Sequence, residues 1–224
     1  MSFLEHLEEL RRRIIYSFIY IILFSSAVFP FSNRVIVYIA RPVKNLYFFS
    51  PQEAIFVRLK ISLALGIVLS LPFLIHQVYL FVRPALNDRE RKYANIFLIS
   101  SFLLFYSSLF LSFIIFIPFI VNTLLRLSGG MIPLINVSSY FSFLIWISAG
   151  FSVAFQFPVL SGILKKIGII DTKWMINNWR FIIIFVFVFA AIITPTYDII
   201  TMLIVSIPLL ILYLLSIIST LFVR

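Results

Sequence analysis

The sequence contains no cysteine and only two histidines in 224 residues. Without cysteine the chain can form no disulfide bond and offers no thiolate as a nucleophile or metal ligand. Protein zinc sites usually need several cysteine or histidine ligands. The composition therefore argues against a metal site, and we expect neither a metal nor a cofactor.

Charged residues are scarce. They make up 12% of the chain, about half the proportion found in ordinary soluble proteins. Hydrophobic residues make up 62% and are gathered into long uncharged runs. Because about 20 apolar residues suffice for a helix to cross a bilayer, we predict one all-α membrane domain over residues 1–224, with six transmembrane helices. The predicted helices cover residues 13–32, 53–82, 92–125, 138–164, 180–195 and 199–222.

The stretches between the apolar runs are predicted to be loops, with one exception. Residues 3–13 carry apolar side chains at helical spacing and are expected to form an amphipathic helix that runs into the first span. Residues 33–52 contain Pro42 and Pro51 and are expected to form an external loop. Residues 83–92 form a short, charged connection.

The net charge of +10 does not indicate nucleic acid binding, because basic residues of membrane proteins gather in loops on the cytoplasmic side. With the six predicted helices, twelve of the eighteen basic residues fall on the side that holds both termini. These are Arg11, Arg12, Arg13, Arg83, Arg89, Arg91, Lys92, Lys165, Lys166, Lys173, Arg180 and Arg224. We therefore predict both termini on the cytoplasmic side, or on the stromal or matrix side in an organelle.

Acidic residues directly precede the first apolar run, in the stretch HLEELRRRI at residues 6–14. Glu8 and Arg12, like Glu9 and Arg13, are four residues apart, in the order that gives weakly stabilising pairs on a helix. Carboxylates also match the geometry of a guanidinium group. The residues alone leave two interpretations open: a solvated helix end, or an acidic site for a cationic ligand.

Several stretches resemble TatC, the multispanning subunit of the twin-arginine protein translocase. The most specific are HLEELRRRI at residues 6–14 and SLPFLIHQVYLFVRPALNDRERK at residues 70–92. Further matches are SPQEAIFVRLKIS at residues 50–62, FSVAFQFPV at residues 151–159 and TPTYD at residues 194–198. The resemblance extends over nearly the whole chain.

The resemblance implies a subunit that binds signal peptides bearing consecutive arginines. Such a subunit helps to move folded proteins across a membrane with energy from the proton gradient. The resemblance also implies small single-span partners of the TatA and TatB type, and we expect self-association within the lipid bilayer.

The resemblance also assigns residues to the signal-peptide site. The glutamates that recognise the signal in TatC fall on Glu9 and Glu90 of this sequence. Glu8 is expected instead to balance Arg12. The other residues that match the two motifs, and that we expect at the same site, are His6, Leu10, Arg11, Phe81 and Pro84.

Two glutamines lie inside predicted membrane helices, where a polar side chain should face protein or water rather than lipid. We expect Gln77 and Gln156 to contact a partner or the signal peptide, and a simple bond between helices is the alternative for Gln156. In the TatC pattern the position of Gln156 is usually glutamate, whereas a glutamine amide cannot ionise. Asp198 is expected to cap an external turn between the last two helices.

Other functional classes fit less well. The sequence lacks G-x-S-x-G, H-E-x-x-H and a glycine-rich phosphate loop, so we expect no enzyme. A secondary solute transporter, or a membrane scaffold for single-span partners, remains the alternative function. A bacterial inner membrane, a plastid thylakoid and a mitochondrial inner membrane are all compatible with the composition.

Overall fold

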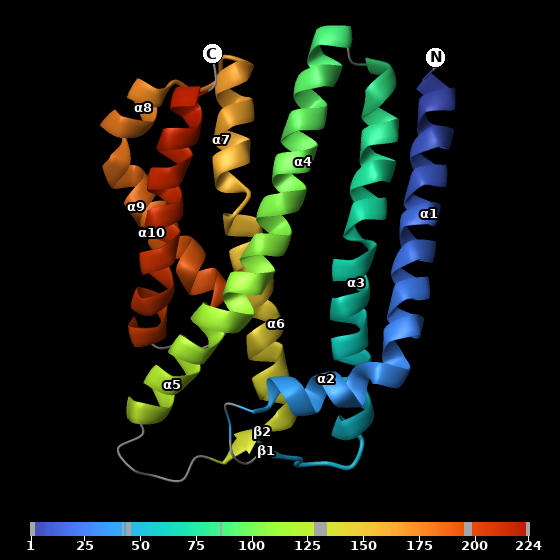
Figure 1. The fold of residues 1–224 in the computed structure, drawn as a ribbon, viewed down its shortest axis with the longest axis vertical. Coiled ribbons are helices and arrows are strands. Elements are labelled where there is room, and N and C mark those ends of the chain that lie inside the picture. Colours follow the sequence, from blue (N-terminus) through green and yellow to red (C-terminus); the bar gives the residue numbers. More distant parts are fainter. Residues whose placement is uncertain are drawn as a thin grey trace. The chain divides into compact units, whose positions relative to one another are not determined.

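The computed structural model describes residues 3–41, 43, 46–85, 87–127, 134–194 and 199–222, and its regular structure is almost entirely helical (Figure 1). The α-helices are α1 (Phe3–Val28), α2 (Ser32–Ile39), α3 (Glu53–Val82), α4 (Asp88–Leu111), α5 (Ile117–Leu127), α6 (Val137–Ala154), α7 (Phe157–Lys166), α8 (Thr172–Asn177), α9 (Trp179–Ile193) and α10 (Ile199–Phe222). The shorter elements are the 3-10 turns η1 (Phe29–Phe31) and η2 (Arg83–Ala85), the π-helical turn η3 (Ser112–Phe116), and the two-residue strands β1 (Leu46–Tyr47) and β2 (Ile135–Asn136).

Five helical stretches of the described residues are long and apolar enough to cross a membrane. They are Glu5–Ile39, Glu53–Val82, Tyr93–Leu127, Val137–Lys166 and Ile199–Leu221. The helix Trp179–Ile193 is apolar but shorter. These helices confirm the prediction of an all-α membrane protein. The sixth crossing and the side of the membrane on which the termini lie stay predictions.

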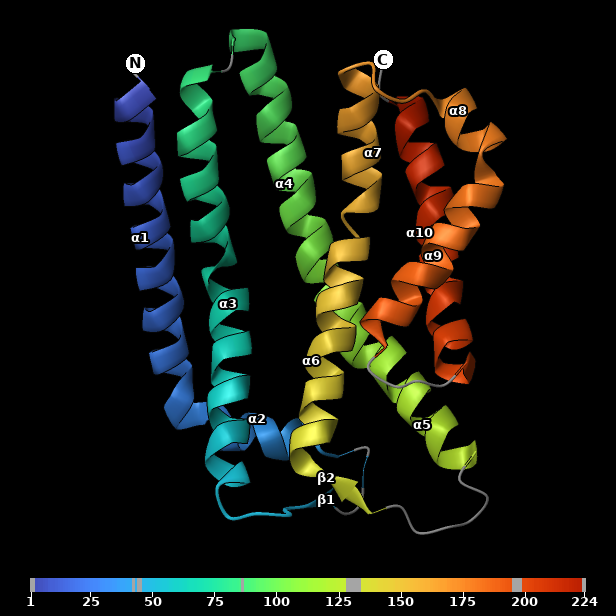
Figure 2. The ribbon, with the colours of Figure 1, turned by 180° about the vertical axis from the view of Figure 1, so that it is seen from behind.

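The chain divides into two compact units. The first comprises Met1–Leu98 and Leu134–Phe141, and the second comprises Ile99–Pro133 and Ser142–Arg224. In the first unit, α1 and α3 lie side by side, as both views of the ribbon show (Figures 1 and 2). This pair of helices forms the framework of the candidate site.

The close approach of α1 and α3 depends on a glycine. A Cβ atom added to Gly66 on α3 would lie 2.7 Å from both the amide nitrogen and the Cα atom of Ser25 on α1. Further along the same pair, Tyr20 stacks on Phe73 with ring centroids 5.0 Å apart. Small residues let membrane helices pack backbone to backbone, where dispersion contacts rather than the hydrophobic effect hold them together.

The segment predicted as an external loop, residues 33–52, is not all loop. Helix α2 occupies its beginning and runs across the end of α1 and α3 in Figure 1. Pro30 lies in η1 between α1 and α2, and its missing N–H interrupts the α-helical hydrogen bonding there. Ser32 donates a hydrogen bond through its hydroxyl to the carbonyl of Phe29 (2.7 Å), which stabilises the bend. The prediction was wrong because Pro42 and Pro51 both come after α2 in the sequence, so they do not prevent the earlier residues from forming a helix.

The two short strands join parts of the first unit that are far apart in the sequence. β1 pairs with β2 in parallel, with Leu46 opposite Ile135 and Tyr47 opposite Asn136. The carboxylate of Glu53, at the start of α3, accepts hydrogen bonds from the side-chain amide of Asn136 at 2.9 and 3.1 Å. The end of the first unit opposite the N-terminus of α1 is therefore held by the pairing of β1 with β2 and by the partly buried contact between the Glu53 carboxylate and the Asn136 amide.

Two helices predicted to be continuous are interrupted in the second unit. The helix predicted over residues 92–125 is divided by η3 into α4 and α5, and the helix predicted over residues 138–164 is divided near Gln156 into α6 and α7. Pro118 and Pro158 follow these two breaks. Each proline lacks the N–H that would bond to the carbonyl four residues earlier, so the regular α-helix cannot continue unchanged.

Hydroxyl groups join α7, α8 and α10 in the second unit. Lys165 on α7 donates hydrogen bonds to the hydroxyl of Thr172 (3.1 Å) and to the carbonyl of Thr220. Tyr213 on α10 donates to the carbonyl of Met175 (2.8 Å). The lysine thus bonds to a carbonyl in the last turn of α10, where a positive charge is favoured by the helix dipole.

Candidate functional site

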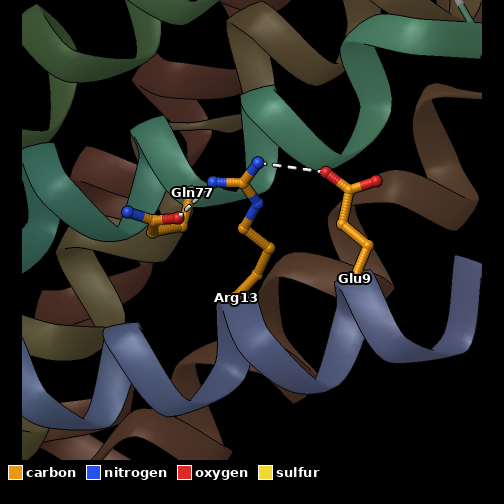
Figure 3. Close-up of polar contacts among 3 residues, drawn as sticks. All are labelled: Glu9, Arg13 and Gln77. Atoms are coloured by element: carbon orange, nitrogen blue, oxygen red, sulfur yellow. Dashed lines mark hydrogen bonds and ion pairs between the residues drawn. The ribbon is translucent and has the colours of Figure 1, made fainter. Parts of the chain in front are cut away.

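The candidate site begins with a polar cluster between α1 and α3, made of Glu9, Arg13 and Gln77 (Figure 3). One guanidinium nitrogen of Arg13, Nη2, lies 3.0 Å from Glu9 Oε1. The other, Nη1, donates a hydrogen bond of 3.0 Å to Gln77 Oε1. Arg13 therefore connects an acid on its own helix with an amide on the neighbouring helix.

The cluster is largely shielded from its surroundings. The side chains of Glu9 and Arg13 are 14% and 19% exposed, and Gln77 is buried. Charge-assisted hydrogen bonds are stronger than neutral ones, and shielding reduces the screening that weakens surface ion pairs. The Nε atom of Arg13 is buried and has no hydrogen-bond partner among the described residues. The guanidinium is thus held by two of its three nitrogens.

The ion pair corrects one prediction made from the sequence. The helical spacing predicted both a Glu8–Arg12 and a Glu9–Arg13 pair, and the resemblance then left Glu8 to balance Arg12. Within the described part of the chain the Glu9–Arg13 pair forms, and a Glu8–Arg12 ion pair is not found. Glu8 and Arg12 are both exposed. An ion pair between exposed side chains gains little because water screens it, whereas Arg13 is fixed by its second partner on α3.

An aromatic contact holds the start of α1 against the end of α3. The imidazole of His6 stacks on the ring of Phe81, with centroids 4.4 Å apart. Both residues were predicted at the site, and the structure brings them together. Pro84 lies in η2, directly after α3. Leu10 and Arg11 are exposed on α1, next to Glu9 in the sequence.

Glu90 lies in the first turn of α4, not in a loop as predicted, because α4 begins at Asp88. The acids Asp88 and Glu90 suit the start of a helix as well as a loop, so the charge of the stretch NDRERK did not distinguish the two. The side chain of Glu90 lies outside the described part of the structure, and so does Asp198. Their predicted roles therefore stay predictions.

Gln156 lies in the second unit, at the break between α6 and α7. It is partly buried, and its Nε2 donates to the carbonyl of Ser101 on α4 (3.3 Å). This contact matches the simpler of the two alternatives, a bond between helices. Two pairs of hydroxyl groups that were not predicted from the sequence lie nearby, Ser108 with Ser152 (3.2 Å) and Ser112 with Ser148 (3.4 Å).

The missed serines had a signal in the sequence. Ser101, Ser108 and Ser112 are seven and four residues apart, and Ser148 and Ser152 are four apart, so each set lies on one face of its helix. Four of these hydroxyls are buried. A set of serines at helical spacing in an otherwise apolar helix predicts a polar seam against a second such helix.

Gln156→Glu is expected to destabilise the protein in neutral buffer. An ionised carboxylate can only accept hydrogen bonds, so it would face the carbonyl of Ser101 without a donor. We expect the melting temperature in detergent to fall by about 2–4 °C, the change that about 1 kcal/mol causes in a chain of this size. The loss should shrink as the pH falls to about 4, where the acid is largely protonated and regains an O–H donor.

Gln156→Leu is the control for this prediction, because it removes the amide without adding a titratable group. Its melting temperature, relative to the unmodified protein, should not depend on pH. An equal loss for Gln156→Glu at both pH values would contradict the role of the Gln156 amide as a donor.

The long apolar helices define an integral, multi-pass membrane protein. Residues 5–208 match the family model described as Sec-independent protein translocase protein (TatC). The chain therefore belongs to the TatC family, as its motifs predicted.

Individual relatives agree with this assignment. The chain is 36% identical over 227 residues to a Sec-independent protein translocase protein TatC of Koribacter versatilis (strain Ellin345), covering 97% of this chain and 84% of the relative. It is 32% identical to the chloroplastic TATC protein of Arabidopsis thaliana, covering 96% of this chain and 64% of the relative. It is also similar to a crystal structure described as the twin arginine translocase receptor TatC, with a TM-score of 0.81, 32% identity, and coverage of 96% of this chain and 97% of that one.

Proposed function

We propose that this protein is the receptor subunit of a twin-arginine translocase. It binds signal peptides with consecutive arginines and helps to move folded cargo across the membrane with energy from the proton gradient. The observation that carries the proposal is the Glu9 carboxylate, which binds a guanidinium group of the protein's own Arg13 at 3.0 Å in a shielded position. A site that holds one arginine in this way has the chemistry to hold another.

Glu90 supplies the second carboxylate of the proposed site. Phe81 contacts His6 at the start of α1, and only eight residues lie between Phe81 and Glu90 in the sequence. Three of these residues form the short turn η2, which contains Pro84 and stiffens the connection. This short, constrained link supports a site in which two acids meet one arginine dipeptide, since such recognition needs rigid supporting residues.

The remaining residues take supporting roles in this proposal. His6 and Phe81 hold the two helix ends together, and Leu10 and Arg11 contact the peptide beside Glu9. Gln77 holds Arg13 beside Glu9, Gln156 joins its helix break to α4, and Asp198 caps an external turn. Small single-span subunits of the TatA and TatB type, and further copies of this chain, are the proposed partners in the bilayer.

Photocrosslinking in membranes tests the proposed site. Probes at Leu10 and at Asn87, both exposed, are combined with signal peptides that carry either Arg-Arg or Lys-Lys. We expect both probes to label the Arg-Arg peptide several-fold more strongly, because a guanidinium can bind a carboxylate through two parallel bonds and an ammonium cannot. Equal labelling of the two peptides, or labelling of neither, would contradict the receptor function and favour a scaffold or a transporter.

A further inference from the structure

We propose that residues 165–180, which we call the basic corner, bind the headgroup of a negatively charged phospholipid. The basic corner comprises the end of α7, all of α8 and the first residues of α9. It lies within the second unit, beside the C-terminal end of α10 (Figure 1). The ligand is a lipid and not the signal peptide, so the inference goes beyond the proposed function and does not depend on it.

Hydrogen bonds give the basic corner a defined shape. The hydroxyl of Thr172, at the start of α8, donates to the hydroxyl of Thr220 on α10 (3.0 Å) and accepts a bond from Lys165 on α7 (3.1 Å). Gly168 lies in the turn between α7 and α8, where its φ of 77° is a conformation that glycine adopts without strain. Because Lys173 directly follows Thr172, its backbone is held close to Lys165.

The charge of the basic corner is almost entirely positive. It contains one acid, Asp171, and four basic residues, Lys165, Lys166, Lys173 and Arg180. The ammonium of Lys165 is partly buried, and both of its acceptors are uncharged, a hydroxyl and a carbonyl oxygen. Among the described residues, no carboxylate lies within ion-pair distance of it. A shielded cation without a counter-ion favours a bound anion, and an ammonium has a third N–H that can donate to one.

The same segment exposes large apolar side chains. Trp174 and Trp179 are 53% and 48% exposed, and Ile167, Ile169 and Ile176 are more than half exposed. Tryptophan is enriched where lipid meets water, and the helices that meet here, α7 and α10, belong to stretches long and apolar enough to cross a membrane. The basic corner therefore suits a ligand that is both anionic and part of the membrane surface, which describes an acidic lipid.

Net charge is the property by which the basic corner can select a lipid. Phosphatidylglycerol and phosphatidylcholine both carry a phosphate, but the second also carries a quaternary ammonium and is neutral overall. Basic residues at the membrane surface attract lipids with a negative net charge, and each such residue changes the affinity by about fivefold. The neutral lipid gains little, because the same residues repel its ammonium group.

Lipid titrations with the full chain in detergent test this proposal. Fluorescent short-chain phosphatidylglycerol and phosphatidylcholine are titrated against the unmodified protein, Lys173→Gln and Lys165→Gln. We expect the unmodified protein to prefer phosphatidylglycerol by about tenfold or more, and each variant to reduce this preference by about fivefold. Lys173 is exposed, so Lys173→Gln keeps the test valid if Lys165→Gln, which loses two hydrogen bonds within the fold, unfolds.

Arg126→Gln is the matched control. It removes one exposed positive charge at the end of α5, which lies at the other end of the same unit (Figure 1). Charges separated by more than a Debye length are largely screened, so this variant should keep the preference of the unmodified protein. Equal affinity for the two lipids, an unchanged preference in Lys173→Gln, or an equal loss in Arg126→Gln would overturn the proposal.

A soluble competitor distinguishes a lipid from a free anion. Glycerol phosphate carries the anionic group without acyl chains, and we expect it not to displace the fluorescent phosphatidylglycerol when the two are present at equal concentrations. Displacement under these conditions would mean that the basic corner binds a soluble phosphate, and the assignment to a lipid would be wrong.

Discussion

Glu9→Gln is expected to weaken binding of an Arg-Arg signal peptide by about tenfold to a hundredfold, since a hydrogen bond to a charged group contributes about 1.5–3 kcal/mol. The substitution keeps the size of the side chain and removes its charge. It also releases Arg13, which retains its bond to Gln77, so the helix pair should stay folded. Titration of a labelled peptide against the full-length protein in nanodiscs measures the change.

Glu8→Gln is the matched control for this prediction. It removes the same charge one residue earlier, from a side chain that is exposed on α1. We expect it to change affinity by less than about threefold, because exposed charges in water interact weakly. Similar losses from the two substitutions would mean that the peptide responds to the net charge of the helix end and not to a defined carboxylate.

Gly66→Ala is expected to have the largest effect on stability, a loss of about 1–3 kcal/mol as in other overpacked sites. The added methyl group would overlap the backbone of Ser25, which cannot move aside as a side chain can. We expect α1 to be displaced from α3, and the contact between Arg13 and Gln77 to be weakened with it. Thermal unfolding in detergent measures the loss of stability.

The same prediction can be checked by helix proximity. Because the chain has no native cysteine, pairs of cysteines introduced on α1 and α3 report their distance by disulfide formation without background. Leu63→Ala, on an exposed part of α3, is the control and should leave both readouts nearly unchanged. Unaltered crosslinking and melting in Gly66→Ala would show that α1 is not held at this glycine.

The sequence predicted some helices closely and missed others for identifiable reasons. The bounds of α3 and α10 coincide with the predicted ranges 53–82 and 199–222, because turn residues or charges delimit these apolar runs on both sides. Helix α2 and the breaks at η3 and Gln156 were not predicted. They depend on how a proline redirects a helix within the fold, and hydrophobicity alone does not report this.

The candidate site was predicted in part. The motif indicated Glu9 and the neighbouring His6, and the helical spacing indicated that Glu9 could reach Arg13. The sequence could not show that Gln77, 64 residues further along, selects Arg13 over Arg12 as the paired arginine. That choice depends on which face of α1 meets α3, and so on the packing at Gly66.

Helix α9 has a consequence for the thickness of the surrounding membrane. Its 15 residues extend over about 22 Å, while the hydrocarbon core of a typical bilayer measures about 30 Å. Trp179 and Arg180, in cation–π contact at its start, are residues that favour the headgroup region. They hold this end of the helix at the membrane surface, so the missing length falls at the other end. If α9 makes the predicted sixth crossing, lipids beside it must shorten or tilt, and vesicles made from shorter-chain lipids should accommodate this protein with less strain.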